Sequence, residues 1–366
     1  MFGGIFKNKK VFVTGHTGFQ GSWLSLWLKL LGSKVIGYSL EPPTEPALFD
    51  ILGLEKEITH IIGDVRNDSF LQSCMTKYKP DIVFHLAAQP LVRISYQKPV
   101  DTFQVNVLGT VNVLESIRNA PSVKAGVIIT SDKCYDNKEW DFAYRENDPL
   151  GGHDPYSASK GAAEIVTSSY NRSFFDLKDK VKVGIATIRA GNTIGGGDWG
   201  QDRIIPDCMR SLFLKKPIKV RNPNAVRPWQ HVLEPISGML LLGQKMFEKP
   251  QLYNEAWNFG PNISASLNVK ELVKKIIKEW KNAVKWHDLS KKSQNAFHEA
   301  NYLRLDSTKA STLLGWQAVY SIDDAIKETT SWYWNYLQKN DMKEFTKSQI
   351  ERYVKKANSK KVIWSA

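Results

Sequence analysis

The fold class that the sequence predicts is α/β: a doubly wound parallel sheet with a smaller, mixed C-terminal domain. The first observation is that short apolar runs alternate with segments of helical spacing over residues 1–190. This alternation is typical of parallel strands joined by helices on both faces of a sheet. The second is a change beyond Gly191 to glycine loops, short strand-like runs and lysine-rich helices. We expect a sheet domain at 1–190, a second domain at 191–366, and segments near 232–260 that return to the sheet.

Length and charge agree with two domains and limit the classes of function. A chain of 366 residues exceeds what one hydrophobic core usually fills. Its net charge of +13 comes largely from lysines after Asn268, which we interpret as a solvated surface that can also attract an anionic ligand. The sequence shows no RNA-binding signature and no basic helix with base-reading residues, so we expect no nucleic-acid partner.

The cysteines and the hydropathy pattern indicate a protein of a reducing compartment. Cys74, Cys134 and Cys208 are odd in number and lack Cys-x-x-Cys spacing, so neither disulfides nor a metal site is expected. No apolar stretch has the length of a membrane span, and the N-terminal residues do not resemble a signal peptide. We therefore expect a cytoplasmic location and no membrane partner.

Residues 10–40 hold the most informative local pattern: an apolar run, three glycines, a segment of helical spacing and a second apolar run. Gly15 permits a tight turn, Gly18 lets the backbone approach a pyrophosphate, and Gly21 lets the helix pack closely on the sheet. The helix N-terminus then offers free N–H groups and the positive end of its dipole to the phosphates. This order of elements predicts a dinucleotide-binding βαβ unit of the Rossmann type.

The next two predicted strands end in residues that could face such a ligand. The run 58–62 precedes Asp64, which either contacts an adenine ring or caps the following helix. The run from Asp81 ends in Ala87 and Ala88, whose small side chains either admit a cofactor or allow tight packing of helix on sheet. Both alternatives stay open at each position.

A long helix is expected from Pro99 to Asn119. Its buried face is predicted from apolar residues at spacings of three and four, namely Phe103, Val107, Val111, Leu114 and Ile117. Asn106 lies beside that face, where a buried polar side chain needs a hydrogen-bond partner.

Two further segments carry candidate catalytic residues. An apolar run ends in Ser131, Asp132 and Lys133, and a helix begins at Tyr156 with Lys160 one turn later. A tyrosine with its ordinary pKa of roughly 10 is a poor base at neutral pH. A lysine cation one turn away, together with a positive nicotinamide ring, is expected to stabilise the phenolate and lower that pKa. Tyr156 could then take a hydroxyl proton while hydride leaves the same carbon for the cofactor.

Together these motifs resemble the extended short-chain dehydrogenase/reductase family that acts on sugar nucleotides. The likeness runs from about Lys9 to Trp316 and comprises the Gly15/Gly18/Gly21 turn, Leu86-Ala-Ala-Gln, Thr130-Ser-Asp, Tyr156-x-x-x-Lys160 and Arg189-Ala-Gly-Asn. Longer runs are similar to the family's 4,6-dehydratases acting on CDP-glucose: VTGHTGFQGSWLSLWL, HLAAQPLVRISY, TSDKCYDNKEW, IGGGDW and RPWQHVLEP. The resemblance implies conversion of CDP-D-glucose to CDP-4-dehydro-6-deoxy-D-glucose, an early step towards dideoxyhexoses of bacterial surface polysaccharides such as the lipopolysaccharide O-antigen.

The resemblance also implies a role for each candidate catalytic residue. Tyr156 takes the proton of the sugar 4-hydroxyl, and Ser131 hydrogen-bonds the same oxygen. Asp132 is the acid that protonates the departing 6-hydroxyl. Lys133 stands where many sugar-nucleotide dehydratases carry a glutamate base, so the identity of the base stays open, and a solvent-facing lysine is the alternative. In a regular strand Asp132 and Lys133 would face opposite ways, so both can act only if the backbone bends.

Cofactor and substrate contacts follow from the resemblance in the same way. NAD is the implied cofactor, held by Gly15, Thr17, Gly18, Phe19, Gly21, Ser39, Asp64, Val65, Leu86, Ala87, Ala88, Asn106, Tyr156, Lys160 and Arg189. The implied substrate contacts, for which ion pairs and core aromatics are the alternative, are Gln89, Arg93, Asn192, Arg203, Arg227, Trp229 and His231. Helices beginning near Pro99 and Tyr156 form a four-helix interface in similar proteins, so a homodimer is expected.

Two other functions remain compatible with the sequence. A 4-epimerase of the same family needs Tyr156 and the cofactor but no acid–base pair for eliminating water, so Asp132 beside Lys133 favours dehydration. A dinucleotide-sensing protein without catalysis would keep the glycine turn and lose the tyrosine, so the presence of Tyr156 and Lys160 argues against that function.

NAD is expected to bind more tightly than NADP. Ser39, Leu40 and Glu41 follow the second predicted strand, with no arginine among them to meet a 2′-phosphate. Glu41 falls about where a ribose-binding acid is expected, and Ser39 is the alternative.

Overall fold

The computed structural model describes residues 1–175, 183–261, 266–280, 284–290 and 302–366. At its centre is a seven-stranded parallel sheet in the order β11-β6-β5-β4-β1-β2-β3. The strands are β1 (Lys10–Thr14), β2 (Lys34–Ser39), β3 (Thr59–Ile62), β4 (Ile82–His85), β5 (Ala125–Ile129), β6 (Gly184–Ala190) and β11 (Ala256–Phe259). The predicted doubly wound α/β fold is confirmed, and the edge strand β11 lies within the segment 232–260.

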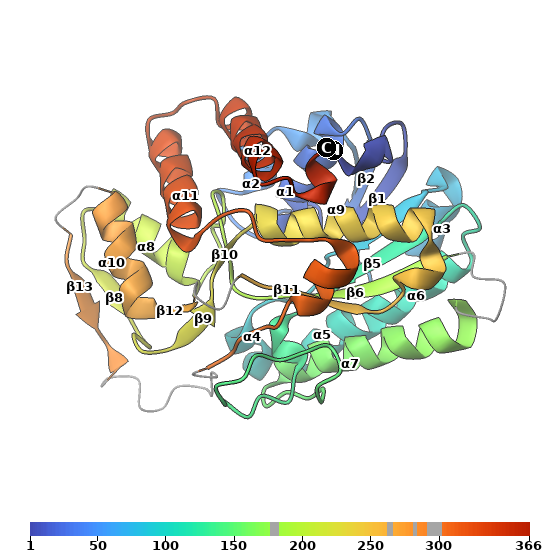
Figure 1. Cartoon of the computed structure of the whole chain (residues 1–366), viewed down its shortest axis with the longest axis horizontal. Coiled ribbons are helices and arrows are strands. Elements are labelled where there is room, and N and C mark those ends of the chain that lie inside the picture. Colours follow the sequence, from blue (N-terminus) through green and yellow to red (C-terminus); the bar gives the residue numbers. More distant parts are fainter. Residues whose placement is uncertain (176–182, 262–265, 281–283, 291–301) are drawn as a thin grey trace.

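Helices cover both faces of this sheet, as Figure 1 shows. One face carries α1 (Phe19–Leu30) and α9 (Leu233–Glu248), and the other carries α3 (Asp68–Tyr78), α6 (Gly109–Arg118) and α7 (Pro155–Tyr170). Side chains of β1 alternate between the two cores: Val11 and Val13 pack on the α1 side, and Phe12 packs on the α3 side. Burial on both faces is why these strands appear in the sequence as continuous apolar runs.

The order of the strands fixes where a ligand can bind. The chain reaches β2 and β3 on one side of β1 and then crosses to β4 on the other side. In open parallel sheets, ligands bind at the carboxyl ends of the strands beside such a crossing. The residues that follow the carboxyl ends of β1, β4 and β5 include Gly15, Ala87 and Ser131.

The helix predicted over residues 99–119 is present, but its buried face differs from the prediction. It consists of α5 (Pro99–Phe103), a π-helical turn (Gln104–Leu108) and α6. A π turn holds one more residue than an α turn and so rotates the following face. Phe103 is exposed and Val107 and Val111 are only partly buried, so these three predictions are wrong. Leu114 and Ile117 are buried as predicted.

The other described elements are shorter strands and further helices. They are α2 (Leu48–Ile51), α4 (Val92–Gln97), α8 (Ile204–Phe213), α10 (Val269–Glu279), α11 (Ile322–Leu337), α12 (Met342–Ser359), and the strand pairs β7 (Thr193–Ile194) with β10 (Gln230–His231), β8 (Ile218–Val220) with β13 (Trp286–Asp288), and β9 (Val226–Pro228) with β12 (Ser266–Asn268). Helices α11 and α12 hold 16 and 18 residues.

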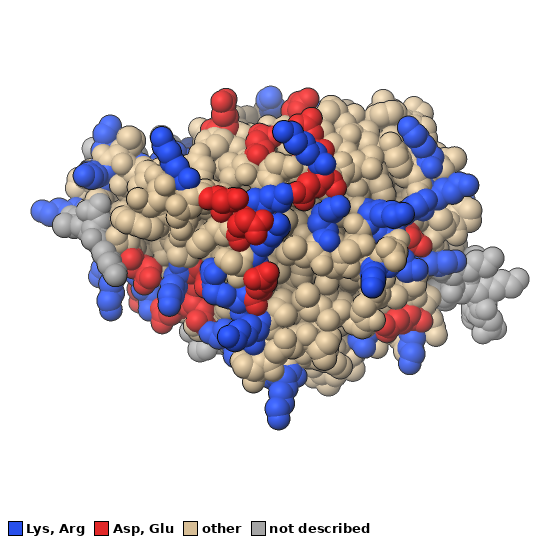
Figure 2. All heavy atoms as spheres, turned by 90° about the horizontal axis from the view of Figure 1, so that it is seen from above, with Lys and Arg blue, Asp and Glu red and all other residues tan. Residues whose placement is uncertain are grey.

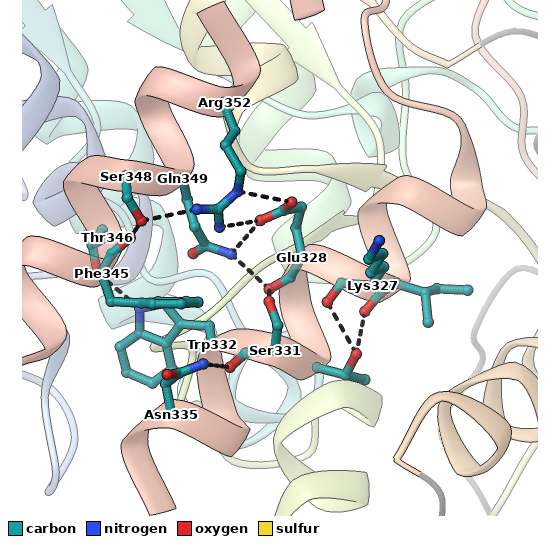
Figure 3. Close-up of polar contacts among 12 residues, drawn as sticks. Lys327, Glu328, Ser331, Trp332, Asn335, Phe345, Thr346, Ser348, Gln349 and Arg352 are labelled. Atoms are coloured by element: carbon teal, nitrogen blue, oxygen red, sulfur yellow. Dashed lines mark hydrogen bonds and ion pairs between the residues drawn. The ribbon is translucent and has the colours of Figure 1, made fainter. Parts of the chain in front are cut away.

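Polar contacts join α11 to α12 beside the sheet. Figure 3 shows Gln349 and Arg352 of α12 donating to the carboxylate of Glu328 on α11. The C-terminal segment also contacts the N-terminal 3₁₀ turn (Phe2–Gly4), because Trp364 stacks on Phe2 with ring centroids 5.0 Å apart. The C-terminal residues thus pack beside the sheet, and the domain division at residue 190 stays a prediction.

Charged side chains of both signs are mixed over the surface. Figure 2 shows lysines and arginines interspersed with acidic residues on one face. Several lysines of the basic C-terminal region are in ion pairs, such as Lys275 with Asp323 and Lys356 with Asp324. Within the described ranges, no helix is long and apolar enough to cross a membrane. The same ranges hold no cluster of three potential metal ligands.

Candidate active site

The glycine turn after β1 has the shape that its sequence predicts. Gly15 has a φ of +74°, and a Cβ there would lie 2.7 Å from the backbone nitrogen of Ala87. A Cβ on Gly21 would lie 2.1 Å from the carbonyl oxygen of Gly15, so the start of α1 packs directly on the turn. Gly18 precedes α1 and no side chain caps the helix. This backbone cradle, which a Cβ would fill, fits a diphosphate at the helix N-terminus.

The end of β2 is held by a hydroxyl pair. Thr17 Oγ1 lies 2.9 Å from Ser39 Oγ and donates to the carbonyl oxygen of Leu40 at 3.0 Å. Glu41 is exposed beyond this point. Ser39 is therefore the better placed of the two residues predicted to meet a ribose.

Asp64 follows β3 and pairs with a nearby arginine. Its carboxylate lies 2.5 Å from Arg66, which lowers the pKa of Asp64 through hydrogen bonding and charge. Arg66 also reaches Asp101 at 2.6 Å. The cap of α3 is Asn67, whose side chain accepts from Phe70 N, so the alternative that Asp64 caps this helix is wrong. Val65, the next predicted cofactor contact, is buried.

The loop after β4 is fixed by two polar side chains. Thr14 Oγ1 accepts from the backbone nitrogens of Leu86 and Ala87. Asn106 accepts from Gln89 N at 2.8 Å and donates to Gln89 O and Ser159 Oγ. These bonds use both the amide oxygen and the amide nitrogen of Asn106 within the protein, so it holds the loop, and its contact with a cofactor stays a prediction.

A cavity of about 840 Å³ opens at the carboxyl ends of the strands, between the sheet and the segments beyond residue 190. Ser131, Asp132, Lys133 and Tyr156 lie together in its wall. Other predicted residues that line it are Phe19, Arg93, Asn192, Arg203, Arg227 and Trp229. The structure thus brings four of the five candidate catalytic residues to the surface of one cavity, and Lys160 lies behind them.

The backbone bends directly after β5, as joint action of Asp132 and Lys133 requires. Residues Asp132–Cys134 form a single 3₁₀ turn capped by Ser131. Ser131 Oγ donates to Asp132 Oδ1 at 3.0 Å, and Lys133 Nζ lies 3.4 Å from the same oxygen. Asp132 is nearly fully buried, and its Oδ2 has no hydrogen-bond partner within the described residues. A buried oxygen without a partner is suited to a ligand group that donates a hydrogen bond.

Tyr156 and Lys160 lie on α7, which begins with Pro155 after the capping residue Asp154. Burial raises the pKa of Tyr156, whereas the Lys133 cation and a hydrogen bond to Ser131 oppose the rise. Lys160 donates to the carbonyl oxygen of Ile129 at 3.2 Å, and burial lowers its own pKa to about 8. Burial therefore dominates the pKa of Tyr156 in the protein alone, and the expected lowering of this pKa by Lys160 together with a nicotinamide ring stays a prediction.

Charged residues that line the cavity form ion pairs with one another. Arg93, on α4, lies 3.1 Å from Asp202, and Arg221, after β8, lies 2.5 Å from the same carboxylate oxygen. Arg203 pairs with the buried Asp198 at 3.1 Å. Sequence reasoning missed the roles of Asp202 and Arg221 here. The signal that could have found them is the charged tract around Asp202, Arg203 and Arg221 after a glycine loop.

Two further substrate candidates lie where predicted. Asn192 lines the cavity with its Oδ1 buried and without a hydrogen-bond partner in the described part of the chain. Trp229 lines it with its indole Nε1 donating to the carbonyl oxygen of Leu267. Both side chains are thus available at the cavity wall.

Three predicted contacts, His231, Arg189 and Gln89, are absent from the cavity wall and bond or pack within the protein. His231 is fully buried between the rings of Trp23 and Tyr320, and burial lowers its pKa to about 4. Arg189 forms a buried ion pair with Glu164 at 2.8 Å. The amide of Gln89 bonds to Leu91 in its own loop and to Thr102 of α5. Each belongs to the packing that supports the site, because its polar groups or its ring are occupied within the protein.

A model of the family described as GDP-mannose 4,6 dehydratase matches residues 12–329. The chain is 45% identical over 352 residues to the CDP-glucose 4,6-dehydratase of Salmonella typhimurium, a match that covers 96% of this chain and 97% of that protein. It is 25% identical over 350 residues to the CDP-paratose 2-epimerase of Salmonella typhi, with 88% and 98% covered.

Solved structures share the fold at lower identity. The dTDP-glucose 4,6-dehydratase of Bacillus anthracis in complex with NAD has a TM-score of 0.73 at 19% identity, covering 89% of this chain and 97% of that one. The UDP-glucose 4-epimerase of Thermotoga maritima with UDP-glucose has a TM-score of 0.76 at 19% identity, covering 90% and 99%. Sequence motifs, fold and relatives agree over most of the chain, which belongs to the GDP-mannose 4,6 dehydratase family of short-chain dehydrogenase/reductase proteins.

Proposed function

We propose that this protein is a sugar-nucleotide 4,6-dehydratase that converts CDP-D-glucose to CDP-4-dehydro-6-deoxy-D-glucose and water. The observation that carries the proposal is the grouping of Ser131, Asp132, Lys133 and Tyr156 at one wall of the cavity. This set offers a base for the sugar 4-hydroxyl and a separate acid–base pair for the loss of water. The choice of CDP is supported by the 45% identical relative, which is named a CDP-glucose 4,6-dehydratase.

Tyr156 is the proposed proton acceptor for the 4-hydroxyl. Its hydrogen bond to Ser131 and the nearby Lys133 cation both favour the phenolate, against the cost of burial. Ser131 would also orient the 4-oxygen, because its hydroxyl lies between Tyr156 and Asp132. Once C4 is a ketone, the proton on C5 becomes acidic enough for a side-chain base to remove.

Asp132 and Lys133 are proposed to act as one acid–base pair. A proton that moves from Lys133 Nζ to Asp132 Oδ1, which are 3.4 Å apart, leaves an amine base and a carboxylic acid. The amine then takes the C5 proton and the carboxylic acid protonates the departing 6-hydroxyl, so that water leaves. The pair ends with the lysine charged and the aspartate ionised, which is the state in which it began.

NAD is the proposed cofactor, and when bound it would supply the acceptor for a hydride from C4 and the donor of a hydride to C6, so that no net oxidation would occur. A Cβ at Gly15 or Gly21 would meet neighbouring backbone, so the turn requires glycine at both positions. The exposed backbone of such a turn suits a diphosphate. The residues that would hold the cofactor are Gly15, Thr17, Gly18, Phe19, Gly21, Ser39, Asp64, Val65, Leu86, Ala87, Ala88, Tyr156 and Lys160.

The nucleotide diphosphate of the substrate would lie against the arginines of the cavity. Arg93, Arg203 and Arg227 all line it, and guanidinium groups suit phosphate oxygens. Asn192 offers a buried amide oxygen without a partner among the described residues, and Trp229 offers a ring face. These five are the proposed substrate contacts.

Incubation with CDP-, UDP- and dTDP-glucose, followed by NMR, tests the proposal. We expect the 4-keto-6-deoxy product from CDP-glucose, and none from the Tyr156→Phe variant as a matched control. A CDP-linked 4-epimer that keeps its 6-hydroxyl would establish the epimerase alternative instead. Dehydration of dTDP- or UDP-glucose without dehydration of CDP-glucose would support the proposed reaction but contradict the proposed preference for CDP.

We also infer a homodimer formed through α5, α6 and α7. These helices pack side by side, and their outer surface carries exposed apolar side chains at Val100, Leu108 and Ile165. A second copy could cover this surface isologously.

A cytoplasmic location and a place early in the synthesis of bacterial surface polysaccharides are part of the same proposal, supported by three free, buried cysteines and by the CDP-glucose relative.

A further inference from the structure

Glu164 is a buried carboxylate behind the candidate catalytic residues, and the proposed chemistry does not use it. It lies on α7 one turn beyond Lys160, with a side chain only 3% exposed. Thr130 Oγ1 donates to its Oε1. Thr187 Oγ1 and Arg189 Nη2 donate to its Oε2 at 2.7 and 2.8 Å. A carboxylate buried this deeply costs more in desolvation than one ion pair reliably returns, so stability alone does not account for it.

The contacts of Glu164 connect α7 to the end of β5. Lys160 Nζ bonds to the carbonyl oxygen of Ile129, and Glu164 bonds to the hydroxyl of the next residue, Thr130. Ser131 follows directly in the chain and caps the turn that carries Asp132. Two successive residues of the helix face therefore fix two successive residues of the chain that leads into the site.

Glu164 also acts electrostatically on Lys160. Burial lowers the pKa of Lys160, and the negative charge of Glu164 opposes this fall. Arg189 lies on the other side of the carboxylate, where it also bonds to Tyr135 and to the carbonyl oxygen of Glu146. The positive end of the ion pair is thus held in place by Tyr135 and by the backbone of Glu146.

We propose that Glu164 is a positioning residue that keeps Lys160 protonated beside Tyr156 and fixes the end of β5 that carries Ser131. The inference rests on the proposed function only for its activity readout. The protonation of Lys160 can be measured without turnover.

The first test follows the titration of Lys160 by NMR of labelled lysine side chains, assigned with Lys160→Met. Glu164→Gln leaves Arg189 buried and unpaired, so the double variant Glu164→Gln/Arg189→Met, which removes both charges, is measured beside it. We expect the Lys160 midpoint to fall by about one pH unit in Glu164→Gln, the lower range for loss of a neighbouring opposite charge. The fall should be smaller in the double variant, because loss of the Arg189 cation offsets part of it. Glu115→Gln, which breaks a surface ion pair with Arg118, is the matched control and should leave the midpoint unchanged.

The second test separates position from charge. Thr130→Val keeps the shape of the side chain at position 130 and leaves the charge of Glu164 in place, but it removes the hydrogen bond between the two residues. We therefore expect kcat to fall about tenfold while the Lys160 midpoint stays unchanged. In the double variant the alkaline limb of kcat should move to lower pH together with the midpoint. An unmoved midpoint in the folded double variant, or an unchanged kcat in Thr130→Val, would overturn the inference. A moved midpoint in a protein that does not dehydrate CDP-glucose would reject the proposed function and leave the charge role of Glu164 standing.

Discussion

Lys133 Nζ lies 3.4 Å from Asp132 Oδ1, although the two residues are adjacent in the chain. Neighbours in a regular strand point to opposite faces, and the 3₁₀ turn after β5 removes that restriction. Both side chains line the cavity, with Lys133 partly exposed and Asp132 almost wholly buried. The proposed loss of water depends on this contact, whereas oxidation at C4 depends on Tyr156.

Replacing Asp132 with Asn should separate these two steps. Asparagine keeps the shape and cannot donate a carboxyl proton to the departing hydroxyl, so elimination should stop. With CDP-glucose, the variant should still reduce its bound nicotinamide once, seen by absorbance, while releasing almost no 6-deoxy product.

Lys133→Met gives the complementary result and the outcome that counts against the pairing. Exchange of the C5 hydrogen in deuterated solvent should slow more than hydride transfer does, because only the exchange needs the amine base. If Asp132→Asn and Lys133→Met both dehydrate at the wild-type rate, the elimination site lies elsewhere.

Tyr156→Phe should abolish turnover and leave the fold and NAD binding intact. The change removes one hydroxyl and little volume from a buried side chain that hydrogen-bonds Ser131. Loss of at least about 100-fold in kcat is expected for a missing general base. Steady-state kinetics and calorimetry check the two parts, and activity near wild type would show that another base is used.

The parts of the site that the sequence predicts are those set by local geometry. Gly15 needs a positive φ and Gly21 needs close packing, and both follow from the order of strand, turn and helix. Tyr156 and Lys160 are one helical turn apart, so their shared face follows from spacing alone. Such patterns depend on a few neighbouring residues.

The predictions that failed depend on contacts distant in the sequence or on a local irregularity. Arg189 and His231 lie in family-like runs, but only the packed structure shows that one pairs with Glu164 and the other packs in the core. Phe103 lies before the π turn and Leu114 after it, so the two no longer share a face, and the apolar spacing gave no sign of this turn. The ion pair of Asp202 with Arg93 joins segments more than a hundred residues apart.

NAD should bind more tightly than NADP. The side chains at the end of β2 are neutral or acidic, and the nearby Arg66 is already paired with Asp64 and Asp101. Leu40→Arg, at an exposed position, should raise NADP affinity about tenfold by adding a phosphate partner. Calorimetry with both cofactors measures this, and equal or tighter NADP binding by the wild type would contradict it.

The dimer proposal predicts that Leu108→Glu yields monomers. Leu108 is exposed in the π turn beside α7, and a charge there could not be buried against a second copy. Leu214→Glu, at a similarly exposed leucine after α8, is the matched control and should leave the mass unchanged. Light scattering at micromolar concentration measures the molecular mass of each variant. A monomeric wild type would contradict the proposed dimer interface.

The last prediction concerns Glu234, which ties α9 to the C-terminal segments. Its carboxylate accepts from the backbone nitrogens of Val319 and Tyr320 and from the hydroxyl of Tyr353. Burial nevertheless raises the pKa of Glu234 to about 7, although these bonds and the Lys360 charge oppose the rise. At pH values between the ordinary glutamate pKa and about 7, the folded state therefore keeps a proton on Glu234 that the unfolded state has lost.

The sign of the pH dependence follows from this difference. A raised pKa in the folded state contributes stability that is fully present below the unfolded pKa of 4.5 and is lost as pH rises through about 7. The free energy of unfolding of the wild type should thus fall relative to Glu234→Gln by about 3 kcal/mol across that window. Glutamine also loses acceptor oxygens, so the variant is less stable throughout, but its own slope lacks this titration. Urea denaturation at several pH values measures the slopes, with the exposed Glu351→Gln as a control that should parallel the wild type. Parallel slopes for wild type and Glu234→Gln would mean that the carboxylate ionises in the folded protein as it does in the unfolded chain.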